Sequence, residues 1–171
     1  MAKTDRRSVL HAAAGTCAAL LGTPPLTAAP RRPQSQVTRP EPLAADLVFE
    51  FVKVAHTDLD ATRQLLQGEP RLIKATWDWG GGDFETAIGA AGHMGRRDIA
   101  GFLLDSGAAI DLFVAAMLGR ITVVQAALEG QPSLFHVPGP HGIPLIAHAR
   151  AGGEPAATVL EYLTEFESSR G

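Results

Sequence analysis

The chain has 171 residues, of which 46% are hydrophobic and 19% charged, and its formal net charge is -3. This length holds one modest domain plus a targeting segment, and the hydrophobic share excludes a wholly disordered chain. Phosphate backbones repel an acidic chain whose Arg and Lys residues are scattered, so we expect no nucleic-acid partner. The single cysteine, Cys17, excludes a disulfide framework and a cysteine-based zinc site.

Residues 1–29 have the features of a signal peptide. A charged start, Met1 to Arg7, leads into an apolar, alanine-rich run from Val9 to Leu21, and small residues follow at positions 27–29. The run is too short for a bilayer, which needs about 20 apolar residues, so we expect no stable membrane span once the signal is removed. The pair Arg6-Arg7 resembles the twin-arginine export motif, and a chance pair before an ordinary secretory signal is the alternative. Either route predicts a periplasmic or otherwise extracytoplasmic protein.

A linker follows the signal at residues 30–42. It contains Pro30, Pro33, Pro40 and Pro42 among Arg, Gln, Ser and Thr, a composition typical of extended chain. We therefore expect the folded domain to occupy residues 43–168.

An internal repeat organises this domain, and its clearest unit is Glu85–Ala108. Ala90 and Ala91 keep one helix thin enough for close stacking, and Gly95 allows a tight turn into the next helix. Gly107 can take the left-handed conformation that ends a helix. The second helix carries an aliphatic stripe at Ile99, Leu103 and Leu104.

Other parts of the domain repeat this unit. Ala115–Arg120 repeats Ala91–Arg96, Leu128–Leu134 parallels Leu66–Leu72, and Gly142–Ile146 opens a further unit. These segments resemble the ankyrin repeat, most specifically in Glu85–Ala108. The resemblance implies an all-α, ankyrin-like solenoid of about four divergent helix-turn-helix repeats, which acts by binding a partner.

Two spacings depart from the ankyrin pattern. Leu145 follows Leu112 by the ankyrin period of 33 residues, but Leu112 follows Ile88 by only 24. We therefore predict that the connection between the second and third units is shortened to a direct turn. The connection before the second unit is about five residues longer than usual, which predicts an extended finger there.

No catalytic, cofactor or metal site is predicted. His136, His141 and His148 are separated by five and seven residues, which matches no usual zinc pattern, and we assign them, with His56 and His93, to loops and helix surfaces. Gly80–Gly82 lacks the Lys-Ser/Thr of a phosphate loop. We expect Asp58 and Asp60, in a predicted turn, to cap a helix rather than to hold a cation. The chain is therefore not expected to be an enzyme.

The strongest binding candidates are Trp77, Asp78, Trp79 and Asp83, in the long connection before the second unit. Tryptophan is favoured at binding hot spots because it buries a large rigid surface. The adjoining glycines would let the loop bend onto a partner. The alternative is that one or both tryptophans fold inward to fill space beneath the loop.

The leading functional hypothesis is an exported scaffold that binds another exported protein through finger loops and inner helices. Two alternatives stay open. One is a small metal-dependent hydrolase or ligand-binding enzyme that uses His136, His141 or His148. The other is a stabilising accessory of an exported enzyme.

Overall fold

The computed structural model describes residues 40–169. The predicted signal peptide of residues 1–29, with Cys17 and the Arg6-Arg7 pair, and the predicted linker up to Arg39 lie outside the described residues. Within the described part, no helix is both long and apolar enough to cross a membrane.

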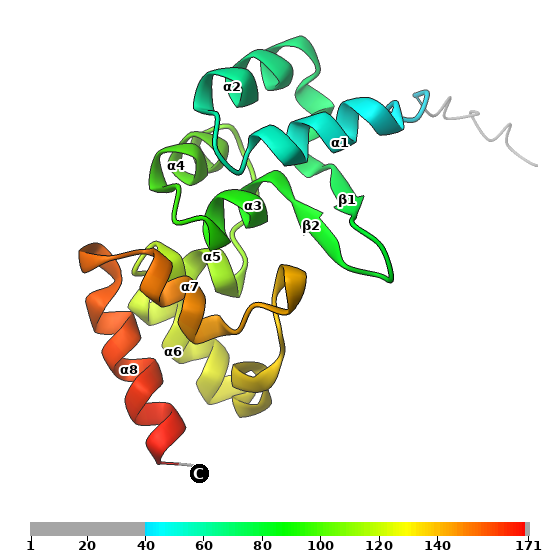
Figure 1. Ribbon diagram of the computed structural model, residues 1–171. Helices are drawn as coiled ribbons and strands as arrows, with labels where there is room; N and C mark the ends of the chain where they lie inside the picture. Colours follow the sequence, from blue (N-terminus) through cyan, green and yellow to red (C-terminus); the bar gives the residue numbers. More distant parts are fainter. Residues whose placement is uncertain (1–39, 170–171) are drawn as a thin grey trace, which may run out of the picture. The chain divides into compact units, whose positions relative to one another are not determined.

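The described chain is mostly helical, and its α-helices follow one another in pairs (Figure 1). The pairs are α1 (Ala45–Val54) with α2 (Leu59–Gly68), α3 (Ala87–His93) with α4 (Arg97–Asp105), α5 (Leu112–Met117) with α6 (Ile121–Gly130), and α7 (Leu145–Ala151) with α8 (Ala157–Ser168). Short 3-10 helices lie in the connections at η1 (Pro70–Lys74), η2 (Pro132–His136), η3 (Pro140–Gly142) and η4 (Glu154–Ala156). This architecture agrees with the predicted all-α class, apart from one small sheet.

Side-chain caps fix where three helices begin. The side chains of Asp58, Thr86 and Asp111 accept hydrogen bonds from backbone N–H groups in the first turns of α2, α3 and α5. Each cap supplies a partner for an N–H that the helix itself leaves unpaired. The predicted capping role is confirmed for Asp58, whereas Asp60 lies in the first turn of α2 with its Oδ1 3.5 Å from Arg63.

Glycines let the pairs approach closely at their turns. Gly95 and Gly119 have φ values of 68° and 74°, which a side chain would disfavour. A Cβ atom at Gly95 would collide with the carbonyl of Ala151, and one at Gly119 with the carbonyl of Pro155. The turn predicted at Gly95 is confirmed, and its glycine also lets α7 pack nearby.

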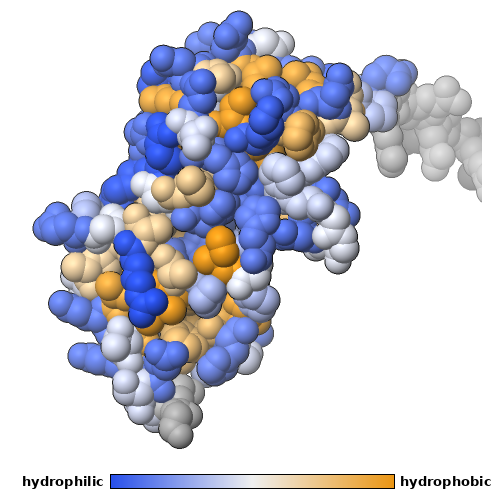
Figure 2. All heavy atoms as spheres, in the orientation of Figure 1, coloured by the Kyte–Doolittle hydropathy of each residue, from blue (hydrophilic) through white to orange (hydrophobic). Residues whose placement is uncertain are grey.

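The short first helices α3, α5 and α7 form the inner layer. α5 packs against both α3 and α7, and α7 also contacts α3 (Figure 1). Only six residues separate α4 from α5, which confirms the shortened connection between the second and third units. On the face in Figure 2, hydrophobic side chains show in patches over α1 and α2 and over the later helices, separated by hydrophilic ones.

The long connection before α3 forms an antiparallel hairpin. Strand β1 (Thr76–Asp78) pairs with β2 (Phe84–Thr86), with Trp77 opposite Glu85. Gly80, Gly81 and Gly82 all have positive φ and make the turn. Strand β2 continues directly into α3, and the hairpin and this helix both contribute residues to the candidate site.

Candidate metal centre

Four side chains from distant parts of the sequence converge in one place. They are His56 in the turn after α1, Glu85 on β2, His93 at the end of α3 and His141 in η3. Each offers one nitrogen or oxygen atom, and these atoms all lie within 4.8 Å of one another. Three imidazoles and a carboxylate are a set of donors that binds transition metals.

Glu85 lies at the centre of the cluster, with a fully buried side chain. Its Oε2 is 3.4 Å from Nε2 of His56 and 3.4 Å from Nε2 of His141, and its Oε1 is 3.0 Å from Nε2 of His93. Tetrahedral ligands bound about 2.0–2.1 Å from a zinc ion are roughly 3.3 Å apart. The three Glu85–histidine separations are close to this value and every other donor pair lies within 4.8 Å, so an ion fits once the donors draw closer together.

Two atoms of the cluster are buried without a hydrogen-bond partner. They are Oε1 of Glu85 and Nε2 of His93, which face each other across 3.0 Å without hydrogen-bond geometry. Buried polar atoms are nearly always satisfied, and an exception calls for an explanation such as an ion. A metal bound to both atoms would satisfy them together.

Hydrogen bonds orient two of the imidazoles. Nδ1 of His56 lies 3.0 Å from the carbonyl oxygen of Val52, and Nδ1 of His141 lies 2.8 Å from Oδ2 of Asp83. Both partners are acceptors, so each Nδ1 carries the proton and donates it. When the ring is neutral, the lone pair is therefore on Nε2, the nitrogen that faces Glu85, and this tautomer can bind a metal.

Asp83 holds His141 at two points. Besides the contact with the ring, its Oδ1 accepts the backbone N–H of His141 at 2.8 Å. His141 has a φ of 58°, a left-handed conformation that is uncommon outside glycine. The clamp thus fixes both the backbone and the ring of a residue 58 positions away in the sequence.

Trp79 covers the edge of the cluster. Its Nε1–H donates to Oε2 of Glu85 at 2.8 Å, and its ring packs against those of Phe49, His56 and His141. The side chain remains 36% exposed. Trp79 therefore orients the carboxylate from the solvent side.

The electrostatics of the cluster favour a charged carboxylate. Burial raises the pKa of Glu85, but contacts with His56, His93 and Trp79 outweigh it and lower the pKa to about 2. Contact with Glu85 in turn raises the pKa of His56 despite its burial. Glu85 therefore offers an anionic donor at neutral pH.

All four residues predicted to bind a partner make contacts inside the chain. Trp77 packs on Phe49, with ring centroids 5.1 Å apart, and Oδ1 of Asp78 accepts the N–H groups of Gly80 and Gly82. Trp79 and Asp83 contact the cluster as described above. The inward packing considered as the alternative is seen for Trp77, which is half-buried, whereas Trp79 contacts the cluster but stays exposed.

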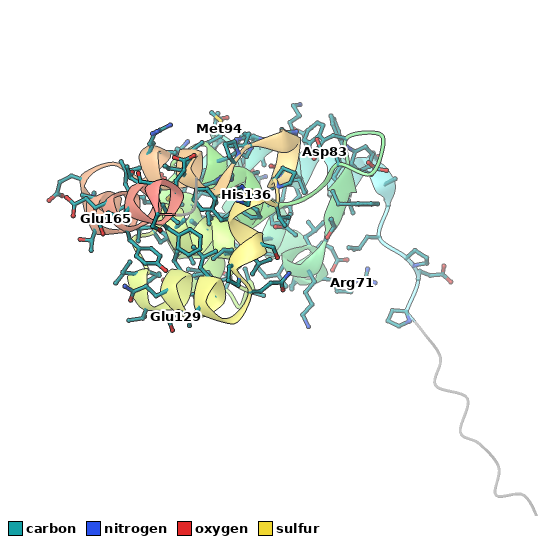
Figure 3. All side chains as sticks on the ribbon, turned by 90° about the horizontal axis from the view of Figure 1, so that it is seen from below. Arg71, Asp83, Met94, Glu129, His136 and Glu165 are labelled. Atoms are coloured by element: carbon teal, nitrogen blue, oxygen red, sulfur yellow. The ribbon has the colours of Figure 1, made fainter. Side chains whose placement is uncertain are left out.

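His136, His141 and His148 lie close together in the sequence but do not form one site in the structure. Only His141 joins the cluster. His136 is exposed and packs against the ring of Phe135, and in Figure 3 it lies apart from Asp83. His148 is buried against Phe113, and its Nε2 has no hydrogen-bond partner.

Sequence reasoning assigned no metal ligand and did not select Glu85 for any role. The four donors belong to different elements and share no local spacing, so no motif marks them. The one local signal is that Glu85 and His93 bracket an inner helix of small and apolar residues.

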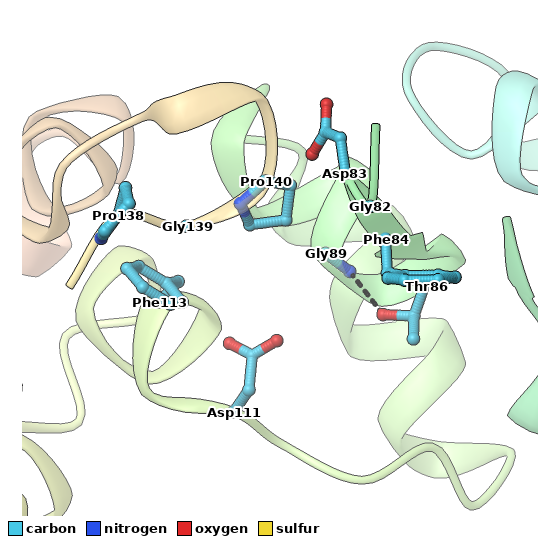
Figure 4. Close-up of a pocket in the computed structure, with 10 residues that line it drawn as sticks. All are labelled: Gly82, Asp83, Phe84, Thr86, Gly89, Asp111, Phe113, Pro138, Gly139 and Pro140. Atoms are coloured by element: carbon cyan, nitrogen blue, oxygen red, sulfur yellow. Dashed lines mark hydrogen bonds between the residues drawn. The ribbon is translucent and has the colours of Figure 1, made fainter. Parts of the chain in front are cut away.

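A shallow pocket of about 360 Å³ lies beside the cluster (Figure 4). The hairpin and α3 form one wall, and the 138–140 segment with Phe113 and Asp111 forms the other. Asp83 lines the hairpin side of this pocket and also holds the ring of His141. In Figure 4 the carboxylate of Asp111 points into the space between Phe113 and Thr86.

Comparison with known proteins adds no assignment to this geometry. No protein-family model, no curated protein and no solved structure matches the chain.

Proposed function

We propose that this protein binds one divalent transition-metal ion through His56, Glu85, His93 and His141. The observation that carries the proposal is the convergence of the four donors around two buried atoms that have no hydrogen-bond partner. The contacts of both Nδ1 atoms support it, because they orient the rings so that Nε2 of His56 and of His141 faces the other donors.

The donor set selects a class of ion. Ca²⁺ takes six to eight oxygen donors and Mg²⁺ keeps several waters, so a centre with three imidazoles suits neither. Imidazole suits Zn²⁺, Cu²⁺, Fe²⁺ and Ni²⁺. We therefore expect zinc or a neighbouring first-row ion, and no tight binding of calcium or magnesium.

Calorimetric titration of the chelator-treated full chain with Zn²⁺ tests this proposal. We expect one ion per chain, with binding lost or strongly weakened in Glu85→Gln and His93→Ala. His136→Ala is the matched control, because it removes a histidine outside the cluster and should bind zinc like the unmodified chain. Equal zinc binding by Glu85→Gln, His93→Ala and the unmodified chain would refute the proposal.

We further propose that the helix pairs form a divergent ankyrin-type array and that the protein is exported. Four consecutive pairs, glycine turns and a layer of short inner helices support the first point. The charged start and short apolar run of residues 1–29 support the second. Localisation of the full chain by cell fractionation tests the export proposal.

A second candidate function is protein binding through the hairpin. Phe84 supports it, because 63% of its surface is exposed beside a pocket that also contains Phe113, Pro138 and Pro140. An aromatic side chain in such a position can bury apolar surface against a partner protein. Affinity capture from a periplasmic extract should enrich a protein that Phe84→Ala no longer retains, and equal retention by both chains would exclude this role for Phe84.

A further inference from the structure

We infer that the metal centre is open on one side and that its ion accepts a small exogenous donor, preferentially an anion, directly from solvent. This inference rests on the proposed metal binding and adds a ligand to it. It follows from the exposure of the donors, from the hydrogen bonds of the Glu85 carboxylate and from the charges around the ion.

The four donors are not equally buried. The side chain of Glu85 is fully buried and that of His93 is 8% exposed, whereas those of His56 and His141 are 19% and 31% exposed. Trp79, which packs against both of the latter rings, is 36% exposed. An ion held among these atoms therefore has protein behind it and a route to solvent past His56, His141 and Trp79.

Bound through one of its two oxygens, the Glu85 carboxylate supplies the ion with a single donor. Oε2 of Glu85 already accepts the Nε1–H of Trp79, while Oε1 has no hydrogen-bond partner. One oxygen and three nitrogens give four protein donors. Zinc can expand to five ligands, and several other first-row ions take six, so a further position remains for a ligand from outside the chain.

The local charge favours an anion at that position. A divalent ion with one coordinated carboxylate keeps a net positive charge. Asp83 also contacts the cluster, where both of its oxygens accept hydrogen bonds from His141, and its negative charge offsets part of this positive charge from the Nδ1 side of the ring. A small anionic donor bound directly to the ion would thus meet the remaining positive charge in a partly buried place, where attraction is stronger than in water.

Visible spectroscopy of the full chain loaded with Co²⁺ tests this inference. Azide is the small anionic probe, and benzoate is a bulkier one that reaches only a position open to solvent. We expect both to change the d–d absorption bands saturably, and azide to do so in the His136→Ala chain as well.

The outcomes separate the two proposals. If Co²⁺ binds with one ion per chain but neither probe alters its bands, the metal binding stands and the open position is refuted. If only azide acts, the vacant position is enclosed, which also contradicts a solvent-facing site. If Co²⁺, like Zn²⁺, does not bind at all, the proposed metal function itself fails.

Discussion

Asp83 binds His141 through both carboxylate oxygens, one to the ring and one to the backbone. Such partners of a metal ligand keep its ring in the coordinating orientation, and their loss typically costs 10–100-fold in metal affinity. Asp83 thus acts on the ion through His141 rather than as a ligand.

Replacing Asp83 with alanine should weaken zinc binding by roughly 10–100-fold, because His141 loses both of its anchors. Competition with a coloured chelator measures the change. Asp78→Ala is the matched control, since Asp78 lies on the same hairpin and bonds only the turn amides of Gly80 and Gly82. Equal losses in the two variants would mean that general damage to the hairpin, and not the clamp, explains the effect.

Burial lowers the pKa of His148 below 6.5, although the carbonyl of Pro144 and the charges of Asp111 and Glu85 oppose the shift. The unfolded chain therefore binds a proton at His148 more readily than the folded chain. The stability contributed by the neutral ring is fully present above pH 6.5 and is lost as the pH falls below that value towards the folded-state pKa.

We accordingly expect the metal-free protein to lose more stability between about pH 7.5 and 5.5 than its His148→Gln variant does. Urea denaturation at each pH measures both chains. The comparison is needed because the raised pKa of His56 acts in the opposite direction, with stability present below pH 6.5 and lost as the pH rises. Parallel pH profiles for the two chains would show that His148 does not titrate as inferred.

The four proposed metal ligands could not be recognised from the sequence. His56, Glu85, His93 and His141 are brought together by the fold, and their spacing reflects the lengths of helices and hairpin rather than a local motif. The residue types of Trp79 and Asp83 and their glycine-rich setting mark them as functional candidates in the sequence. Their contacts with Glu85 and His141 become visible only in three dimensions.

At the scale of elements, the turn glycines decide how closely the helix pairs pack. Gly119 combines a positive φ with backbone contact to Pro155, so a side chain there meets both strain and a clash. Gly101 lies inside α4 with helical backbone, and a Cβ atom added there would meet no neighbouring atom within 4 Å.

Gly119→Ala should therefore destabilise the protein by about 1–3 kcal/mol or more, the cost of a side chain in the left-handed region. Gly101→Ala should stabilise it by roughly 0.5–1 kcal/mol, because alanine loses less entropy in a helix than glycine. Chemical denaturation of both variants checks the opposite signs. Destabilisation of similar size in both would contradict the assigned role of Gly119.

The elements themselves are largely predictable from the sequence. Apolar stripes, the turn at Gly95 and the cap at Asp58 depend on residues near one another in the chain, and the structure contains each of them. The pairing of Trp77 with Glu85 is not predicted, because the expected finger carries no assigned secondary structure. Strand pairing in the hairpin places Glu85 inside the cluster. Because the hairpin was not predicted, the candidate metal site could not be predicted either.

At the scale of the whole molecule, the four donors come from three parts of the chain: the turn after α1, the hairpin together with α3, and η3. An ion that binds only the folded state stabilises it by mass action, by about 4 kcal/mol at a thousandfold excess over the dissociation constant.

Zinc should therefore raise the melting temperature of the chelator-treated chain. It should also slow amide hydrogen exchange most in the β1–β2 hairpin and in residues 137–143, the segments that carry Glu85 and His141. Calorimetry and hydrogen-exchange mass spectrometry measure the two effects. His136→Ala should respond like the unmodified chain, and uniform protection along all helices would contradict this account.

The order of the donors along the chain has a consequence for biosynthesis. His56, Glu85 and His93 leave the ribosome first, and His141 follows only after α4, α5 and α6 have been made. A nascent chain can hold at most three of the four donors until three of the helix pairs have emerged. An ion bound by all four donors would therefore indicate that these three helix pairs have been synthesised and that the 137–143 segment has packed against the hairpin.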